Sequence, residues 1–372
     1  MKTRDLLLDN LKALLIFLVV IGHLCDTSLG FIQDRSYEIA EASMAASGEL
    51  DEAEAEIEDS VLLEIQGNAG RLCRSMFCAI YAFHMPLFVF LAGCTSKKIA
   101  GDRKRTISRC FSFFFLYIMM KFVNIAVQAA FGKTVSFSLL SESGVPWYAL
   151  AMCLFYLIAY LTREFNQTLV LVLSLMIALL CGYDTSIGDY LVLSRVLVFY
   201  PFFLAGLLCN WDALKKTLRK PWVRWLSLLF LVVFLLFCWF QTDLIYTMRP
   251  LFTGRNSYKS LHEYQQYGFW LRLLCYLLST AVSAAVIAVV PNRPFKVSVI
   301  GSRTLQIYFW HRSIIYVMSY AGVYQFLEAL LGAGRARVSI VWMAFSFVLV
   351  WLLSFEPIQK PFQLLFRSSL RE

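Results

Sequence analysis

Residues 11–26 read LKALLIFLVVIGHLCD and combine the composition of a membrane-spanning helix with three ionisable side chains. Lys12 stands near the start of the apolar run, His23 lies deep inside it, and Asp26 follows shortly afterwards. A span needs about 20 mostly apolar residues, and an ionisable group within it is costly in hydrocarbon. This stretch therefore raises two questions: whether the chain crosses a membrane, and what its ionisable side chains do within that membrane.

The composition of the whole chain addresses the first question. Of its 372 residues, 59% are hydrophobic and 16% are charged, and the mean hydropathy is +0.64. Soluble domains carry about 25% charged residues, and here the apolar residues come in long blocks. We predict an all-α polytopic protein of the lipid bilayer with one integral-membrane domain over residues 1–372. The net charge of +9 does not indicate nucleic-acid binding, because the basic residues occupy short loops between apolar blocks.

The apolar blocks predict a bundle of about ten transmembrane helices. The expected spans are roughly 11–29, 75–95, 110–131, 146–162, 168–183, 192–210, 222–241, 268–290, 299–321 and 338–355. With a cytosolic N-terminus, 21 of the 34 lysines and arginines fall on the cytosolic side, nine on the outer side and four within spans. This bias predicts that both termini are cytosolic. The sequence fits a bacterial inner membrane and a eukaryotic organelle membrane equally well.

The first outer segment, at about 32–70, is strongly acidic. Its stretch from Glu38 to Glu64 holds ten acids and no base. Alanine and glutamate favour a helix, but the like charges repel one another. We interpret this segment as a solvated, poorly ordered insertion, with a partner-binding loop as the alternative.

Three of the four histidines, His23, His84 and His311, fall near the middle of expected spans. Ionisable residues within a membrane are functional candidates by default. His84 stands beside Pro86, which cannot donate to the helix ladder and frees the carbonyl of Ala82. We expect supporting roles for His84 and His311. No metal-ligand spacing occurs among the histidines and cysteines, so we expect no bound metal or cofactor.

Helical geometry links the ionisable residues of the first span. Lys12 and His23 are eleven residues apart, so they lie within about 20° of one face and about 16 Å apart along the axis. Asp26 is close enough to His23 to orient the imidazole. A cation at the cytosolic end and an imidazole further out suit coenzyme A, a long ligand with an anionic head. A neutral imidazole is a suitable base for an attacking hydroxyl, while a structural hydrogen bond to a neighbouring helix is the alternative.

Basic and aromatic residues near the ends of other spans extend this hypothesis. Arg103, Arg105 and Arg109 follow the second span and could bind the phosphates of coenzyme A, although positive-inside anchoring explains them as well. The candidates for the acceptor side, near outer ends of spans, are Trp147, Arg195 and Arg272. Snorkelling to lipid headgroups and an aromatic belt are the alternatives for these residues.

Five ordered motifs resemble the membrane-bound acyltransferase family 3, and more closely its fucose 4-O-acetylase-like branch. They are DNLKALLIFLVVIGH at 9–23, YAFHMPLFVFLAG at 81–93, VPWYAL at 145–150, SRVLVFYPFFLAG at 194–206 and IGSRTLQIYFWHRSI at 300–314. The first motif has Lys12 where the family often has arginine, which keeps the charge but not the planar fork. The second has Ala92 where serine is common, and the acidic segment is not typical of the family.

The resemblance implies a membrane O-acyltransferase that moves an acetyl group from acetyl-CoA, as co-substrate, to a hydroxyl of a carbohydrate or glycolipid. It implies that His23 is the catalytic residue, as base or acyl carrier, and that Lys12 and the basic residues after the second span serve the donor. A proton-coupled transporter with a histidine relay is the alternative, disfavoured by the few acids within spans. A membrane scaffold that uses the acidic segment is a third hypothesis.

Overall fold

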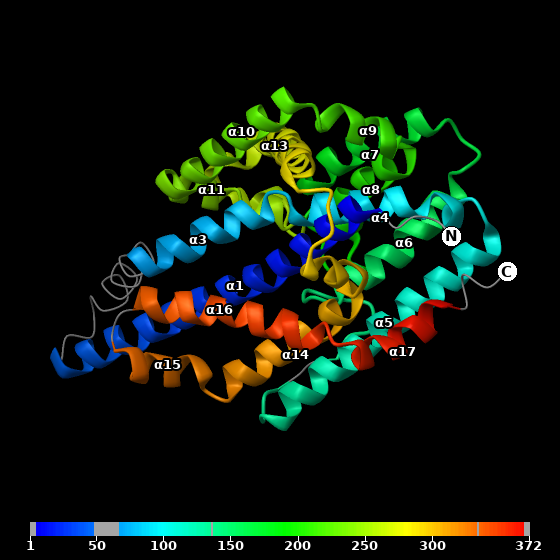
Figure 1. Ribbon diagram of the computed structural model, residues 1–372. Coiled ribbons are helices and arrows are strands. Elements are labelled where there is room, and N and C mark those ends of the chain that lie inside the picture. Colours follow the sequence, from blue (N-terminus) through cyan, green and yellow to red (C-terminus); the bar gives the residue numbers. More distant parts are fainter. Residues whose placement is uncertain (1–4, 48–66, 135–136, 333–334, 368–372) are drawn as a thin grey trace.

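Helices joined by short connections make up the part of the chain that the computed structural model describes, residues 5–47, 67–134, 137–332 and 335–367 (Figure 1). No β-strand occurs among these residues, which confirms the all-α prediction. The α-helices are α1 (Leu6–Ser47), α3 (Asn68–Tyr81), α4 (His84–Ala100), α5 (Arg103–Ala130), α6 (Trp147–Leu161), α7 (Gln167–Leu180), α8 (Leu193–Leu208), α9 (Trp211–Leu218), α10 (Pro221–Phe240), α11 (Thr242–Thr247), α12 (Arg249–Phe252), α13 (Gly268–Val289), α14 (Thr304–Tyr320), α15 (Val323–Leu331), α16 (Arg335–Leu353) and α17 (Glu356–Arg367). Three 3₁₀ segments are η1 (Cys181–Tyr183), η2 (Tyr258–Tyr267) and η3 (Lys296–Ser302).

Six helical segments in the described part of the chain are long and apolar enough to cross a membrane. Two bent pairs, α8 with α9 at 93° and α14 with α15 at 58°, raise the number to eight if each pair forms one span. A helix occurs at each of the ten expected positions, but α6 and α7 have only 15 and 14 residues, fewer than the 20 or so that a straight span needs. The multi-pass helical architecture is therefore confirmed, whereas the count of ten is not.

Helix α1 runs through the interior of the bundle and packs against α3, α16, α14 and η3 (Figure 1). Its apolar residues Leu11, Leu15 and Val20 are fully buried between these neighbours. The helix continues to Ser47, so the first part of the acidic segment is helical and is not a loop from residue 38 onwards. The rest of that segment, residues 48–66, lies outside the described residues.

The second expected span is two helices with a break, as the proline predicted. Helix α3 ends at Tyr81 and α4 begins at His84, with the backbone of Phe83 at φ −141° and ψ −21° between them. The carbonyl of Ala82 is left without a helical partner, and the Ser279 hydroxyl of α13 donates to it at 2.5 Å. The break is thus stabilised by a neighbouring helix, and it places His84 at the first turn of α4.

Helices α4 and α8 approach each other closely through two glycines. A Cβ atom at Gly93 would collide with the carbonyl of Phe203, and one at Gly206 would collide with the carbonyl of Phe90. Small residues at a helix contact let backbones approach in this way within membranes. The contact brings α4, with His84, against α8, with Arg195. In contrast, α10 buries only Phe234 and Cys238 of its apolar residues, as expected of a helix that faces lipid.

Candidate functional site

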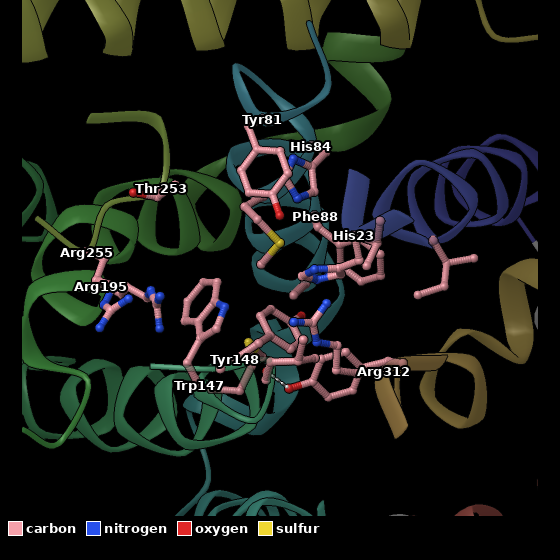
Figure 2. A pocket seen from close by; sticks show the side chains of 18 of the residues that line it. His23, Tyr81, His84, Phe88, Trp147, Tyr148, Arg195, Thr253, Arg255 and Arg312 are labelled. Carbon is pink, nitrogen blue, oxygen red and sulfur yellow. Dashed lines mark hydrogen bonds between the residues drawn. The ribbon is translucent and has the colours of Figure 1, made fainter. Parts of the chain in front are cut away.

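A cavity of about 530 Å³ lies among α1, α3, α4, α6, α8, α14 and the segment around α12 (Figure 2). Its volume falls within the range of small-molecule sites, about 300–1,000 Å³. The ionisable side chains that line it are Lys12, His23, Asp26, Tyr81, His84, Tyr148, Tyr156, Arg195, Arg249, Arg255, Tyr308 and Arg312. It is the site at which the polar groups of several spans meet.

One stripe of α1 forms a wall of this cavity. Lys12, Ile16, Val19, His23 and Asp26 all line it, and their spacing of four, three, four and three residues is that of a single helix face. Lys12 and His23 therefore face the same space, as the helical geometry predicts, with Lys12 nearer the N-terminal end of α1.

Asp26 lies in the cavity wall but contacts a different partner from the one expected. Its carboxylate accepts a hydrogen bond from Arg249 at 3.0 Å. No hydrogen bond joins Asp26 to the His23 ring among the described residues. The expectation that Asp26 orients His23 is therefore not matched by the geometry, because the carboxylate is turned towards Arg249, the first residue of α12.

His311 packs directly against His23. The two ring centroids are 5.3 Å apart, with the planes inclined at 35°. Nδ1 of His311 lies 3.0 Å from the carbonyl of Ile307 and 2.9 Å from that of Tyr308. A ring nitrogen beside a carbonyl oxygen must donate, so Nδ1 carries the proton. These bonds fix the His311 ring, which in turn limits where the His23 ring can move.

His84 both satisfies the backbone at the break and lines the cavity. Its Nδ1 donates to the carbonyl of Ile80 at 2.9 Å, and its ring lies 4.7 Å from the ring of Tyr81. Figure 2 shows His84 and Tyr81 together on one side of the cavity. His84 thus makes a local backbone hydrogen bond and lines the cavity at the same time.

Trp147 and Arg195, two of the acceptor-side candidates, line the cavity. The Arg195 guanidinium carbon lies 5.0 Å from the centre of the Trp147 ring, and its nitrogens donate to the carbonyls of Glu142 at 3.4 Å and Ser143 at 3.0 Å. Trp147 begins α6 and stacks on Phe199 of α8. The two motifs at 145–150 and 194–206 thus meet at one wall.

Arg272 does not line the cavity. It is 1% exposed, and its Nη1 and Nη2 donate to the carbonyls of Ala178 and Asn256 at 2.9 and 3.2 Å. The guanidinium also lies 4.5 Å from the centre of the Tyr258 ring. Its contacts connect α7, η2 and α13, and they place it outside the acceptor side that the sequence suggested.

The three basic donor candidates lie at the start of α5, outside the cavity lining. Asp102 caps this helix by accepting a hydrogen bond from the Arg105 backbone nitrogen at 2.8 Å, as a short acidic side chain does at an N-terminus. Arg103 is exposed. Arg109 lies with its guanidinium 5.0 Å from the centre of the Phe366 ring. These residues can meet only a part of a ligand that extends beyond the cavity.

Three lining arginines were not among the site residues predicted from the sequence. Arg312 was visible as a charge within a span, next to His311, and this signal could have singled it out. Arg249 begins the short helix α12 and Arg255 follows it, outside the expected spans, where a single arginine carries no such signal. Only the folded chain shows that both residues reach the cavity.

Comparison with known families assigns this region of the chain. The model of the family described as "Acyltransferase domain", of the acyltransferase family 3, matches residues 5–355. No curated protein and no solved structure matches the chain. The matched range contains every helix that lines the cavity.

Proposed function

We propose that this chain, which belongs to the acyltransferase family 3 and is a multi-pass membrane acyltransferase, transfers an acetyl group from acetyl-CoA to a hydroxyl of a carbohydrate or glycolipid acceptor. The observation that carries the proposal is that Lys12 and His23 line one cavity from the same face of α1. A cation and an imidazole at this spacing suit the two ends of an extended thioester donor.

The donor would lie along the α1 stripe. Lys12 and His23 are about 16 Å apart along the axis, which suits a neutral pantetheine arm between a phosphate-bearing head and a thioester. The nucleotide would remain outside the cavity, near the basic start of α5 with Arg103, Arg105 and Arg109. Both termini and this donor end would face the cytosol, and the acceptor would enter from the other side, in a bacterial inner membrane or an organelle membrane.

His23 would move the proton of the acceptor. Its neutral imidazole takes the proton of the hydroxyl as that oxygen attacks the thioester carbonyl carbon. The tetrahedral intermediate then collapses, the carbon–sulfur bond breaks, and the imidazolium returns the proton to the departing thiolate. The products are the O-acetyl ester and coenzyme A with a free thiol. In a second route, the His23 imidazole attacks the thioester carbonyl carbon first and coenzyme A leaves as the thiolate. The acceptor hydroxyl then attacks the acetyl-imidazole, the free imidazole is released, and the proton of the hydroxyl passes to the thiolate.

The neighbours of His23 support this function without taking part in bond breaking. His311 holds the position of the ring by packing at 5.3 Å. His84 and Tyr81 line the same cavity and help to form a polar surface next to the reacting groups. Trp147 and Arg195 would shape the acceptor end.

The test is transfer by purified protein in detergent, with labelled acetyl-CoA and candidate glycans. His23→Ala should lower the transfer rate by about 10²–10⁴-fold, while thermal stabilisation by coenzyme A persists. His262→Ala is the matched control, because His262 is the fourth histidine and is exposed in η2, outside the cavity lining. Full transfer by folded His23→Ala protein would contradict the catalytic assignment, and no stabilisation by coenzyme A would contradict the donor.

The acceptor can be identified by mass analysis of glycans from cells with and without the gene. Loss of an acetyl increment from one glycan on deletion would support O-acetylation and name the acceptor. Unchanged glycans would contradict a carbohydrate acceptor.

A further inference from the structure

The cavity carries more positive than negative charge. Among the described residues, five lysines and arginines line it, and Asp26 is the one acid that does. Lys12 belongs to the donor end proposed above. The four arginines that line the remainder are Arg195, Arg249, Arg255 and Arg312.

Two of these arginines are compensated by acids. Arg249 pairs with Asp26 at 3.0 Å, and Arg255 pairs with Asp189 at 2.6 Å. Arg255 donates to Asp189 through both Nε and Nη2, in the bidentate arrangement that planar guanidinium favours. These two charges need no ligand.

In the described part of the chain, Arg195 has no paired carboxylate of its own, because the two acids that attract it, Asp189 and Glu142, pair with Arg255 and Lys121. Its nitrogens donate to two backbone carbonyls, and its guanidinium lies over Trp147. No carboxylate lies within 4 Å of it among the described residues. A carbonyl dipole offsets only part of a full charge, so Arg195 keeps an attraction for an anion in the cavity.

Arg312 is the least compensated of the four. Its guanidinium carbon lies 4.5 Å from the centre of the Tyr316 ring and the Tyr316 side chain is a hydrogen-bond partner, but its Nη1 is buried without a hydrogen-bond partner in the described part of the chain. The acid that influences it, Asp26, is held by Arg249. A buried charge without a counter-ion is unfavourable unless a ligand supplies one.

Arg312 also lies beside the proposed catalytic residue. It follows His311, whose ring is 5.3 Å from that of His23, and Figure 2 shows Arg312 next to His23, with Arg195 and Arg255 on the opposite side of the cavity. The negative charges of acetyl-CoA are on its nucleotide phosphates, whereas the pantetheine arm and thioester are neutral. The donor therefore brings no counter-charge to Arg312.

We propose that the acceptor is anionic and that its carboxylate or phosphate binds to Arg312 beside His23, with Arg195 attracting the same acceptor from the opposite wall. The inference rests on the proposed function, because it names the acceptor class of that site. Since Arg312 and His23 are neighbours, the anionic group and the acetylated hydroxyl belong to the same sugar or to adjacent ones.

The first test measures binding without a donor. Purified protein in uncharged detergent is heated with matched sugars: glucuronate against glucose, galacturonate against galactose, and glucose 6-phosphate against glucose. The acidic member of a pair should stabilise the protein and the neutral member should not, and added salt should weaken the effect. The two sugar acids and the sugar phosphate show which anionic group, carboxylate or phosphate, the site binds. Equal stabilisation by both members, or none by any sugar, would overturn the proposal.

The second test uses variants. Arg312→Gln should weaken binding of the acidic sugar by about tenfold or more, and Arg312→Lys should restore part of it. Arg163→Gln is the matched control, because Arg163 is exposed, pairs with Glu164 and lies outside the cavity lining. If Arg312→Gln lowered transfer to acidic and neutral acceptors equally while binding stayed unchanged, Arg312 would act on the reacting thioester and the proposal would fail. The wild-type sugar pairs decide the question even if that variant does not fold.

The two proposals fail in different ways. Stabilisation by coenzyme A without a preference for acidic sugars would overturn only the anionic acceptor. Binding of acidic sugars without any effect of coenzyme A would overturn the proposed transfer reaction and leave the anion site in place.

Discussion

Arg272 and Arg312 both stand within apolar helices, α13 and α14, yet the surroundings of the two charges differ. The nitrogens of Arg272 donate to the carbonyls of Ala178 and Asn256, and its guanidinium lies over Tyr258. Arg312 makes no hydrogen bond to a backbone carbonyl among the described residues; its side-chain partner is Tyr316, and its Nη1 has no partner. The first arginine is part of the framework that connects α7, η2 and α13, whereas the second faces a cavity.

The comparison shows that an arginine within a span is not in itself a functional signal. What separates the two is whether the guanidinium lines the cavity: that of Arg272 is enclosed among backbone carbonyls outside it, whereas that of Arg312 lines it, with Nη1 unpartnered among the described residues. Lys121 belongs with Arg272, since it donates to the carbonyls of Ser138 and Ser141 and pairs with Glu142 at 2.9 Å. A charge enclosed by its own protein outside the cavity stabilises the fold, and one that lines the cavity without a paired carboxylate is available to a ligand.

Replacing Arg272 by methionine should have the largest effect on stability. The change removes the guanidinium donors from the carbonyls of Ala178 and Asn256, and we expect a loss of about 3 kcal/mol in the free energy of unfolding. Thermal unfolding in detergent measures this, with Arg163→Met as the control at an exposed site. Transfer per folded molecule should be unchanged. An Arg272→Met protein that unfolds at the wild-type temperature but has lost transfer would show that Arg272 acts on the acceptor.

The same replacement at Arg312 should act in the opposite way. A largely enclosed charge without a paired counter-ion costs desolvation free energy, so Arg312→Met should unfold at the same temperature as the wild type or higher. Transfer to an anionic acceptor should fall by about tenfold or more, as measured by initial rates. A strongly destabilised Arg312→Met protein would show that Arg312 belongs to the framework after all.

Replacing either arginine by lysine should have a smaller effect, which concerns the stability of the protein at Arg272 and the binding of the anion at Arg312. Lysine keeps the charge but lacks the planar fork that reaches two carbonyls and stacks on a ring. Arg272→Lys should therefore still lose about 1–2 kcal/mol of stability, whereas Arg312→Lys should regain part of the anion binding. Unfolding and binding curves of both variants check this, and full stability of Arg272→Lys would argue against the fork as the essential feature.

The part of the site that lies on one helix could be predicted from the sequence. Lys12, His23 and Asp26 face one cavity because their spacing follows the helical repeat, which needs no tertiary information. The break before Pro86 was predictable for a similar reason, since proline removes a backbone donor whatever surrounds it. The partner of the freed carbonyl, Ser279, comes from a distant helix and could not be predicted.

The remaining part depends on contacts between segments far apart in the chain. Nothing in the sequence around Arg249 and Arg255 links them to the site, and only the fold brings them to the cavity. Arg272 and Arg195 were equivalent as charges near span ends, and only their neighbours assign one to the framework and the other to the cavity. Apolar patterning likewise located helices at all ten expected ranges, but it could not predict that α6 and α7 are too short to be straight spans.

Asp26→Asn should give the smallest effect and also tests the expectation that this acid orients His23. The pair with Arg249 is partly exposed, at 35% and 41% of the two side chains, so solvent screening limits its contribution to about 1 kcal/mol or less. Since Asp26 is the one acid lining the cavity among the described residues, its neutralisation leaves more positive charge there. The apparent affinity for an anionic acceptor should then rise slightly, opposite in sign to the effect of Arg312→Met.

Initial rates over a range of acceptor concentrations measure this change, with Arg249→Gln as the matched variant of the pair. Arg249→Gln should lower the affinity for an anionic acceptor where Asp26→Asn raises it, because the two variants shift the charge of the cavity in opposite directions. If Asp26→Asn instead lost as much transfer as His23→Ala at every acceptor concentration, the carboxylate would be required by the imidazole. The pair would then belong to the catalytic centre, because a group that orients a base affects the rate whatever the charge of the acceptor.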